Sequence, residues 1–195
     1  MRRPLRSLDE RLLRSLRTRG HDDRRVERAV AGFSRLGEHG GVWLAIGAVG
    51  WALDRPRAER WSRAVGTVAG TYALNTAIKL AVRRRRPELP GLPALTGTPT
   101  QLSFPSAHAS TSFAAAGLYT RLGLPAPVLY GLAVKLSLSR LYLGVHYPSD
   151  VLAGAALGAL VGARPFGEER TPAATPRAAA AGGVSGSGVR AGETV

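Results

Sequence analysis

Five apolar segments with almost no charge constrain the fold of this chain more than any other feature. They lie near residues 40–53, 64–82, 106–120, 123–140 and 149–163. A straight helix needs about 20 residues to span a bilayer, with roughly 17 as a lower limit, so the first and last segments are marginal. We expect an all-α fold, namely a membrane helical bundle of about five spanning or partly spanning helices.

Glycines recur at every fourth position of the last segment, at Gly154, Gly158 and Gly162. A stripe of small residues lets two helices approach closely within a bilayer. The stripe is only moderately specific, because a chain rich in alanine and glycine also produces such spacing by chance. It nevertheless favours a packed helical bundle.

The chain is strongly basic, with 27 Lys and Arg against 13 Asp and Glu and a formal net charge of +14. Such a charge suits either nucleic acid or a membrane surface. The sequence contains no aromatic-interleaved basic stripe and no zinc pattern, so we expect a membrane partner and no nucleic acid. The absence of cysteine excludes disulfides, thiolate metal sites and a cysteine nucleophile.

Three regions follow from composition. Residues 1–38 hold eleven arginines and read as one or two basic amphipathic helices, in which Leu5, Leu12, Leu13 and Leu16 share a face. We expect them to lie at an anionic lipid surface, the alternative being a solvated helix packed on the domain. Residues 39–166 are expected to form one membrane-embedded domain, with a loop at 88–104 that roofs the site, and residues 167–195 a disordered tail.

The first stretch with possible chemistry contains Lys79, Arg86 and Pro87. An ionisable residue inside an apolar segment, such as Lys79, normally faces a polar interior and has a partner, which here would be an anion. Pro87 stops the helix and places the Arg86 guanidinium where its planar fork can bind phosphate oxygens. Taken alone, the stretch is more typical of a basic membrane flank that holds a helix at the lipid headgroups than of a catalytic site.

The second stretch is Pro105, Ser106, Ala107 and His108. Proline favours the first turn of a helix, so the backbone N–H groups of the next three residues should be unpaired and attract phosphate. His108 is placed to give a proton to a departing alkoxide. The alternative is an ordinary helix start with a surface histidine.

The third stretch contains Arg140, His146 and Asp150. A carboxylate in the first turn of the last helix can accept an N–H from the His146 imidazole, which leaves the other ring nitrogen free to attack phosphorus. The alternative is a capped helix start with a structural histidine.

Together the three stretches resemble the signature motifs of the type 2 phosphatidic acid phosphatase superfamily. Those motifs are Lys, six residues and Arg-Pro; Pro-Ser-Gly-His; and Ser-Arg, five residues, His, three residues and Asp. This sequence departs from them once, with Ala107 in place of the motif glycine, and alanine still offers its backbone N–H. Among the family's members, the chain is most similar to short bacterial membrane lipid phosphatases.

The resemblance implies a role for each motif residue. His146 would be the nucleophile that forms a phosphohistidine, Asp150 would orient it, and His108 would protonate the leaving group. The phosphate-binding residues would be Lys79, Arg86, Ser106, Ala107 and Arg140. Arg83, Arg84 and Arg85 lie between motif positions and are interpreted as lipid headgroup contacts, and His21 and His39 as surface residues.

The resemblance also implies a metal-independent phosphatase without a cofactor, located in the cell membrane as a multi-pass protein. The expected substrate is a phosphorylated lipid, namely a polyprenyl phosphate, a polyprenyl diphosphate or a polyprenyl-phosphate-linked sugar phosphate. Phosphatidate or phosphatidylglycerol phosphate, and a non-catalytic lipid-binding protein with the same fold, remain alternatives. The sequence leaves open the oligomeric state and which membrane face carries the site.

Overall fold

The computed structural model describes residues 3–18 and 23–164, and within these ranges its regular structure is helical apart from two isolated bridges. The all-α expectation is therefore confirmed, and the predicted apolar segments correspond to the last five α-helices. The predicted tail at 167–195 lies outside the described residues. The helices are α1 (Arg3–Arg17), α2 (Arg24–Arg35), α3 (Gly41–Leu53), α4 (Ala58–Val82), α5 (Ala107–Arg121), α6 (Ala126–Tyr142) and α7 (Pro148–Gly162), with short 3-10 turns at Glu38–Gly40 and Arg55–Arg57.

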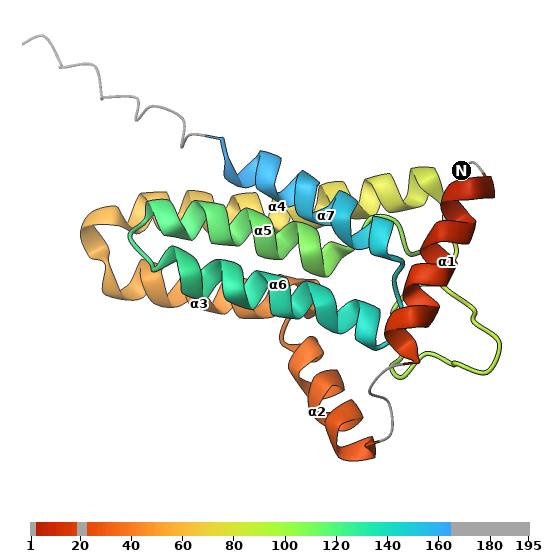
Figure 1. Ribbon diagram of the computed structural model, residues 1–195. Helices are drawn as coiled ribbons and strands as arrows, with labels where there is room; N and C mark the ends of the chain where they lie inside the picture. The colour runs from red at the N-terminus through yellow and green to blue at the C-terminus, as the bar shows by residue number, and fades with distance from the viewer. Residues whose placement is uncertain (1–2, 19–22, 165–195) are drawn as a thin grey trace, which may run out of the picture.

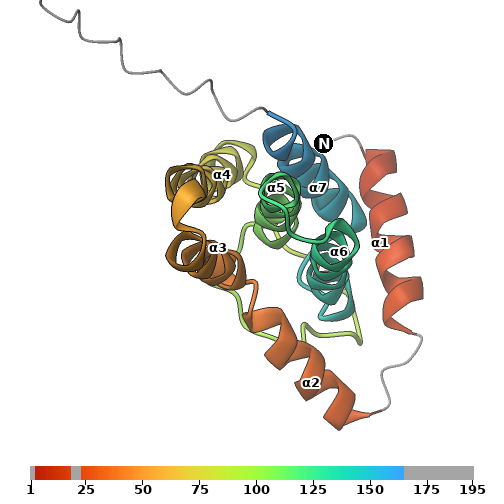
Figure 2. The ribbon, with the colours of Figure 1, turned by 90° about the vertical axis from the view of Figure 1, so that its left-hand side faces the viewer.

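Helix α5 forms the centre of the bundle, with α3 and α4 on one side and α6 and α7 on the other (Figures 1 and 2). Most α5 side chains are buried around the whole helix, including Tyr119, whose hydroxyl donates to the Trp43 carbonyl oxygen of α3 at 2.8 Å. The Trp43 indole donates in turn to Ser112 of α5 at 2.8 Å. A helix buried on every side belongs in a core, and here it ties both halves of the bundle together.

Helix length and hydropathy do not identify a membrane crossing. In the described part of the chain, no single helix is both long and apolar enough to span a bilayer. The longest, α4, has 25 residues, whereas α3 has 13 and α7 has 15.

The glycines of α7 face α5 at very short range. A Cβ atom at Gly158 would lie 2.2 Å from the Ser110 carbonyl oxygen, and one at Gly154 would lie 2.5 Å from the Ser106 carbonyl oxygen. Both distances are shorter than any normal contact, so the two backbones pack directly against each other. The small-residue stripe seen in the sequence therefore marks a real helix interface.

Substitution of Gly158 by alanine is expected to lower the thermal unfolding midpoint of the purified protein, because the new methyl group meets backbone atoms that cannot rotate away. Overpacking of this kind costs about 1–3 kcal/mol. Gly131→Ala is the matched control, since a Cβ at Gly131 of α6 meets nothing within 4 Å and alanine favours a helix by up to about 1 kcal/mol. Equal midpoints for the two variants would contradict the close contact.

The N-terminal region forms two helices that pack on the bundle, α1 against α6 and α7 and α2 against α6. The predicted apolar face of α1 is partly wrong, because Leu13 is fully buried whereas Leu12 and Leu16 are about half exposed. The buried side of α1 also carries Asp9 and Arg17. The Arg17 guanidinium donates to the Pro93 carbonyl oxygen at 2.9 Å, so polar contacts with the loop, which helical periodicity cannot reveal, set the orientation of this helix.

Candidate active site

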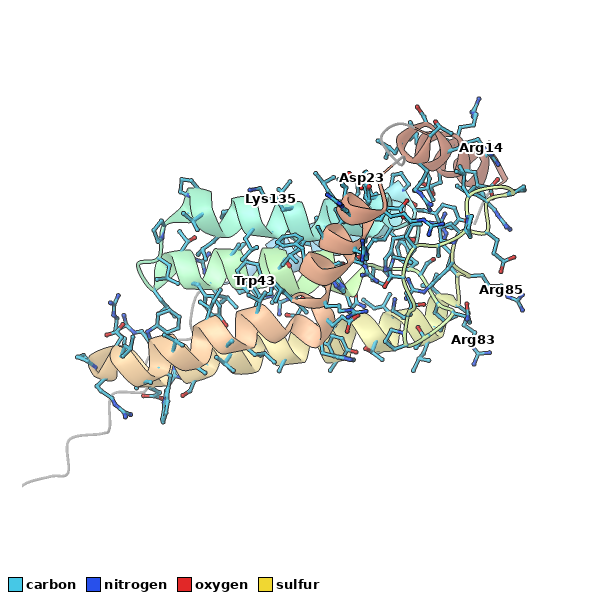
Figure 3. All side chains as sticks on the ribbon, turned by 90° about the horizontal axis from the view of Figure 1, so that it is seen from below. Arg14, Asp23, Trp43, Arg83, Arg85 and Lys135 are labelled. Carbon is cyan, nitrogen blue, oxygen red and sulfur yellow. The ribbon has the colours of Figure 1, made fainter. Side chains whose placement is uncertain are left out.

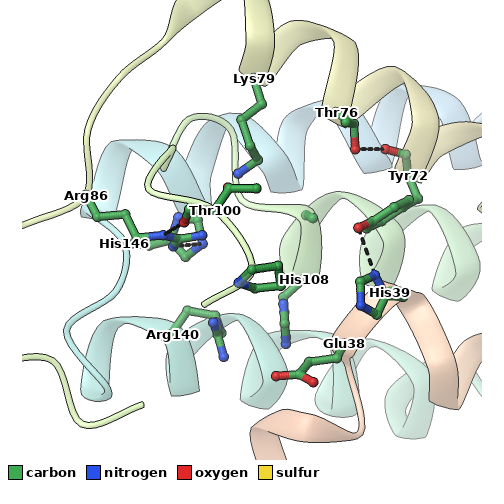
Figure 4. A pocket seen from close by; sticks show the side chains of 12 residues that line it. Glu38, His39, Tyr72, Thr76, Lys79, Arg86, Thr100, His108, Arg140 and His146 are labelled. Carbon is green, nitrogen blue, oxygen red and sulfur yellow. Dashed lines mark hydrogen bonds between the residues drawn. The ribbon is translucent and has the colours of Figure 1, made fainter. Parts of the chain in front are cut away.

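The three motif stretches meet at one end of the bundle, around a pocket of about 100 Å³ (Figure 4). Ser106 and Asp150 lie behind the pocket, and the Ser106 N–H donates to the Asp150 carbonyl oxygen at 3.0 Å. The Ser106 N–H was predicted to be unpaired, and that prediction is wrong. The other predicted site residues line the pocket, namely Lys79, Arg86, Ala107, His108, Arg140 and His146.

Lys79 projects from the end of α4 under the loop that precedes α5. Its ammonium group lies 3.1 Å from the Leu102 carbonyl oxygen and 3.2 Å from that of Pro105. Lys79 was expected to be paired with an anion, whereas backbone carbonyl groups hold it here. Carbonyl dipoles orient the ammonium without neutralising it, so its full charge acts on the pocket.

Arg86 follows α4 and is anchored at two points. Its Nε donates to the Thr100 carbonyl oxygen and one terminal nitrogen donates to the Val145 carbonyl oxygen, both at 2.7 Å. Burial, followed by the nearby Arg140 guanidinium, lowers the pKa of Arg86 to about 10. The side chain therefore keeps its charge at neutral pH.

Arg140 lies near the end of α6, almost fully buried. One terminal nitrogen donates to the Ser34 hydroxyl at 2.7 Å, while its buried Nε has no partner among the described residues. The buried Ser106 hydroxyl also lacks a partner there. Unpaired buried donors are costly, and both would be satisfied by an oxyanion. The pocket thus combines three cations with donors that suit a phosphate group.

His146 occupies the turn between α6 and α7. Its Nε2 lies 3.2 Å from an Arg86 terminal nitrogen, and because arginine has no acceptor, Nε2 must be the unprotonated nitrogen in this contact. The proton then resides on Nδ1, which faces Asp150. Burial, then the charges of Arg86, Lys79 and Arg140, lowers the pKa of His146 well below 6.5, so a neutral imidazole is favoured, with its Nε2 lone pair directed at Arg86.

The carboxylate of Asp150 is held on both oxygens. Oδ2 accepts the Tyr147 N–H at 2.9 Å and Oδ1 accepts from Arg84 at 2.7 Å. The His146 Nδ1 lies 3.6 Å from Oδ2, which is too long for a hydrogen bond. The predicted hydrogen bond between the two side chains is therefore absent in this structure, although such contacts commonly shorten only when substrate is bound.

His108 begins α5 and contacts the N-terminal helices. Its Nε2 donates to the Ser34 carbonyl oxygen of α2 at 2.9 Å, because a carbonyl oxygen can only accept. A Cβ at Gly37 would lie 2.7 Å from the His108 ring, so the Nε2 edge of the ring is packed. Proton exchange with a substrate is left to Nδ1. Ser34, which holds both His108 and Arg140, was missed because no motif marks it.

Glu38, His39 and Tyr72 form a polar wall of the pocket that sequence reasoning also missed. The His39 Nδ1 lies 2.8 Å from the Tyr72 hydroxyl. His39 is exposed, as expected for a surface histidine, but it also lines the pocket. The φ of His39 is 52°, next to Gly40 at 74°. A positive φ is uncommon for residues other than glycine, and sequence periodicity does not reveal it.

Arg84 does not match its interpretation as a headgroup contact. Its side chain is only 9 % exposed and pairs with Asp9 and Asp150, whereas Arg83 and Arg85 are exposed and point away from the bundle (Figure 3). Arg83 ends α4 in the left-handed conformation, with φ of 53°. The chain therefore leaves the helical path there, and Arg84 turns inward.

Known proteins resemble this chain in both sequence and fold. The PAP2 superfamily matches residues 60–166. A decaprenylphosphoryl-5-phosphoribose phosphatase of Mycobacterium tuberculosis is 48% identical over 134 residues, which cover 68% of this chain and 74% of that protein. Its counterpart in Mycolicibacterium smegmatis is 49% identical over 125 residues, or 62% of this chain and 67% of that one.

Two solved structures share the fold at low sequence identity. The transmembrane PAP2 type phosphatidylglycerolphosphate phosphatase of Bacillus subtilis has a TM-score of 0.65 at 22% identity and covers 83% of this chain and 84% of its own. LpxE of Aquifex aeolicus has a TM-score of 0.67 at 23% identity, and the match covers 80% of this chain and 92% of LpxE. The extent of the family match, together with the close relatives, establishes that this chain belongs to the PAP2 superfamily.

Proposed function

We propose that this protein removes the terminal phosphate from a polyprenyl-phosphate-linked sugar phosphate, through a phosphohistidine intermediate. The chain is a phosphoric ester hydrolase of the PAP2 superfamily. The observation that carries the proposal is the convergence of three cations and the two motif imidazoles, His108 and His146, on one small pocket. The relatives named for a phosphoribose lipid support the choice of substrate.

In the proposed mechanism, Lys79, Arg86 and Arg140 bind the phosphate oxygens. Arg86 turns from the His146 Nε2 to the phosphate, and the freed lone pair attacks phosphorus in line with the leaving oxygen. The cations and the Ser106 hydroxyl stabilise the charge on the equatorial oxygens. The doubly protonated form of His108, whose Nε2–H stays on the Ser34 carbonyl oxygen, gives its Nδ1 proton to the departing alkoxide, and Asp150 accepts a hydrogen bond from His146 Nδ1. Water then hydrolyses the phosphohistidine.

The polar wall supports a sugar as the phosphate-bearing group. A carboxylate such as Glu38 repels a phosphate, although its charge also partly offsets that of the buried Arg140, and it can take a further role at the edge of the cationic pocket. Sugar hydroxyls supply one, because a carboxylate accepts hydrogen bonds from two of them at once. The Tyr72 ring and the His39 imidazole add an aromatic edge and further polar atoms beside Glu38.

The distribution of side chains supports a membrane location, with residues 39–166 as the embedded domain. The interior of the bundle holds many polar groups, including Asn75, Ser110 and Ser112, all fully buried. Large apolar side chains are exposed on its outside, at Val49, Trp51, Leu74, Leu80, Val128, Val134, Leu138, Leu152 and Leu160. Water-soluble monomers rarely expose so much apolar surface. On α1, exposed Leu8, Leu12 and Leu16 lie beside arginines, as suits a lipid headgroup layer.

The substrate proposal is tested by phosphate release from a panel of lipids in chelator. Wild type is expected to prefer a polyprenyl-phosphate-linked pentose phosphate over a polyprenyl monophosphate and over phosphatidate. Glu38→Gln should lower kcat/KM for the sugar substrate by about tenfold, the value of one lost charge-assisted hydrogen bond, and leave the other two substrates nearly unchanged. This loss of selectivity would assign Glu38 to the sugar.

Two outcomes would contradict the assignment. An equal loss on all three substrates in Glu38→Gln would show that Glu38 supports the catalytic groups rather than the sugar. A wild-type preference for phosphatidate or phosphatidylglycerol phosphate would favour the alternative glycerolipid function. Glu59→Gln is a matched control, because Glu59 is an exposed carboxylate at the start of α4 that pairs with Arg63.

A further inference from the structure

A buried network of charges lies behind His146 and includes a residue from the N-terminal helix. Arg84 donates through one terminal nitrogen to Asp150 Oδ1 and to the Ser149 hydroxyl, and through the other to Asp9 Oδ2, each at 2.7 Å. Asp9 Oδ1 accepts the Ser149 N–H at 3.0 Å and Oδ2 accepts its hydroxyl at 2.6 Å. Asp9 therefore holds both Arg84 and the first turn of α7.

The network is shielded from water. The side chains of Arg84 and Asp9 are 9% and 7% exposed and that of Asp150 is fully buried. The Arg84 guanidinium also stacks 4.0 Å from the Tyr147 ring. Charges this deeply buried persist only when they are paired and hydrogen-bonded, so the position of Arg84 depends on Asp9 as much as on Asp150.

The balance of charge explains what Asp9 contributes. Two carboxylates and one guanidinium leave a single net negative charge beside His146. Without Asp9 the net charge of this group is zero. The Arg84 charge then acts on Asp150 alone, which weakens that carboxylate as an acceptor for the His146 Nδ1 proton. The other charged or titratable groups around His146 are Lys79, Arg86, His108 and Arg140. None of these four can supply a negative charge beside His146.

Asp9 lies outside the residues that match the superfamily, which begin at 60. Helix α1 is held in place independently of it, by buried Leu13 and by the Arg17 contact with Pro93. A Cβ at Gly144 would lie 1.7 Å from an Arg17 terminal nitrogen, so α1 fits closely against the turn that carries His146. Because α1 packs in this position, Asp9 lies beside the active site.

We infer that Asp9 is a positioning residue for the His146–Asp150 pair, acting through Arg84, and that α1 is therefore part of the active-site machinery. The inference rests on the proposed role of His146. The basic N-terminal helix then has a role in catalysis in addition to its proposed contact with lipid. Asp9 touches no substrate in this scheme; it sets the charge and the orientation of Asp150.

The test compares Asp9→Asn with wild type in the full-length protein. The variant is expected to lower kcat about tenfold with little change in KM, and to move the acidic limb of the kcat/KM pH profile to lower pH by about one unit, as the loss of a nearby charge does. Glu10→Gln is the matched control, because Glu10 is the next carboxylate on α1 and forms an ion pair with Arg6 at the surface. It should behave as wild type.

A second variant separates the charge effect from simple loss of structure. Asp9→Asn combined with Arg84→Gln restores one net negative charge beside His146 and should return the acidic limb to its wild-type position. NMR titration of labelled histidine reads the same shift without turnover, so it remains informative if the assigned phosphatase activity fails. An unmoved His146 titration in Asp9→Asn, or an activity loss fully explained by a smaller folded fraction, would overturn the inference.

Discussion

Replacement of His146 by alanine is expected to abolish phosphate release, with a loss of at least about 10⁴-fold in kcat, as for removal of other enzymatic nucleophiles. Among the described residues, the charged groups that act on His146 are the cations Arg86, Lys79 and Arg140, and none of them is a nucleophile suited to replace its imidazole. The matched control is Lys135→Ala, since Lys135 is exposed on the outer face of α6 (Figure 3). It should retain wild-type activity.

The covalent step gives this prediction a second measurement. Brief incubation with substrate carrying labelled phosphorus, followed by alkaline quenching, should label wild type at His146 and leave His146→Ala unlabelled. The pH profile adds a third, because the lowered pKa of His146 keeps the attacking nitrogen unprotonated to below pH 6.5. Activity should therefore persist at mildly acidic pH. Turnover of His146→Ala within tenfold of wild type would refute the nucleophile assignment.

Replacement of His108 by alanine is expected to cost about 10²–10⁴-fold in kcat/KM on an alkyl phosphate, the usual contribution of a general acid. The loss should be much smaller on an aryl phosphate, because a phenolate leaves without a proton. The quantity to measure is kcat/KM, which reports the step that forms the phosphohistidine. Equal losses on the two substrates would show that His108 binds phosphate rather than protonating the leaving group.

The helices and the site pocket differ in how far sequence patterns predict them. The apolar segments predicted α3 to α7, although α4 begins at Ala58 rather than near residue 64. The Gly154, Gly158 and Gly162 stripe predicted close helix packing, but it did not identify α5 as the partner. Both signals depend on residue type and local spacing. The family resemblance predicted that Lys79 and His146 share one site, and both line the same pocket. Chain-distant contacts were not predictable: Ser34 meets His108 across 74 positions and Asp9 meets Arg84 across 75.

The amphipathic pattern of α1 failed for a related reason. Periodicity sorts side chains by polarity, and it assigned Leu12 and Leu16 to a common apolar face with Leu13. The structure buries Asp9, Leu13 and Arg17 instead, because acidic and basic groups at those positions find buried partners on the bundle. From sequence alone a charged residue is assigned to the surface, because its buried partner is not visible in the sequence.

The sequence by itself determined the helical class of the protein, the order of its helices and the chemical groups of its site. These depend on residue type and local spacing, which a linear chain displays. Only the tertiary structure decided which arginine faces the pocket, which supports the catalytic carboxylate and which faces outward. Four consecutive arginines, Arg83 to Arg86, are chemically identical, so their separate environments arise from the left-handed turn at Arg83 and from partners on distant helices.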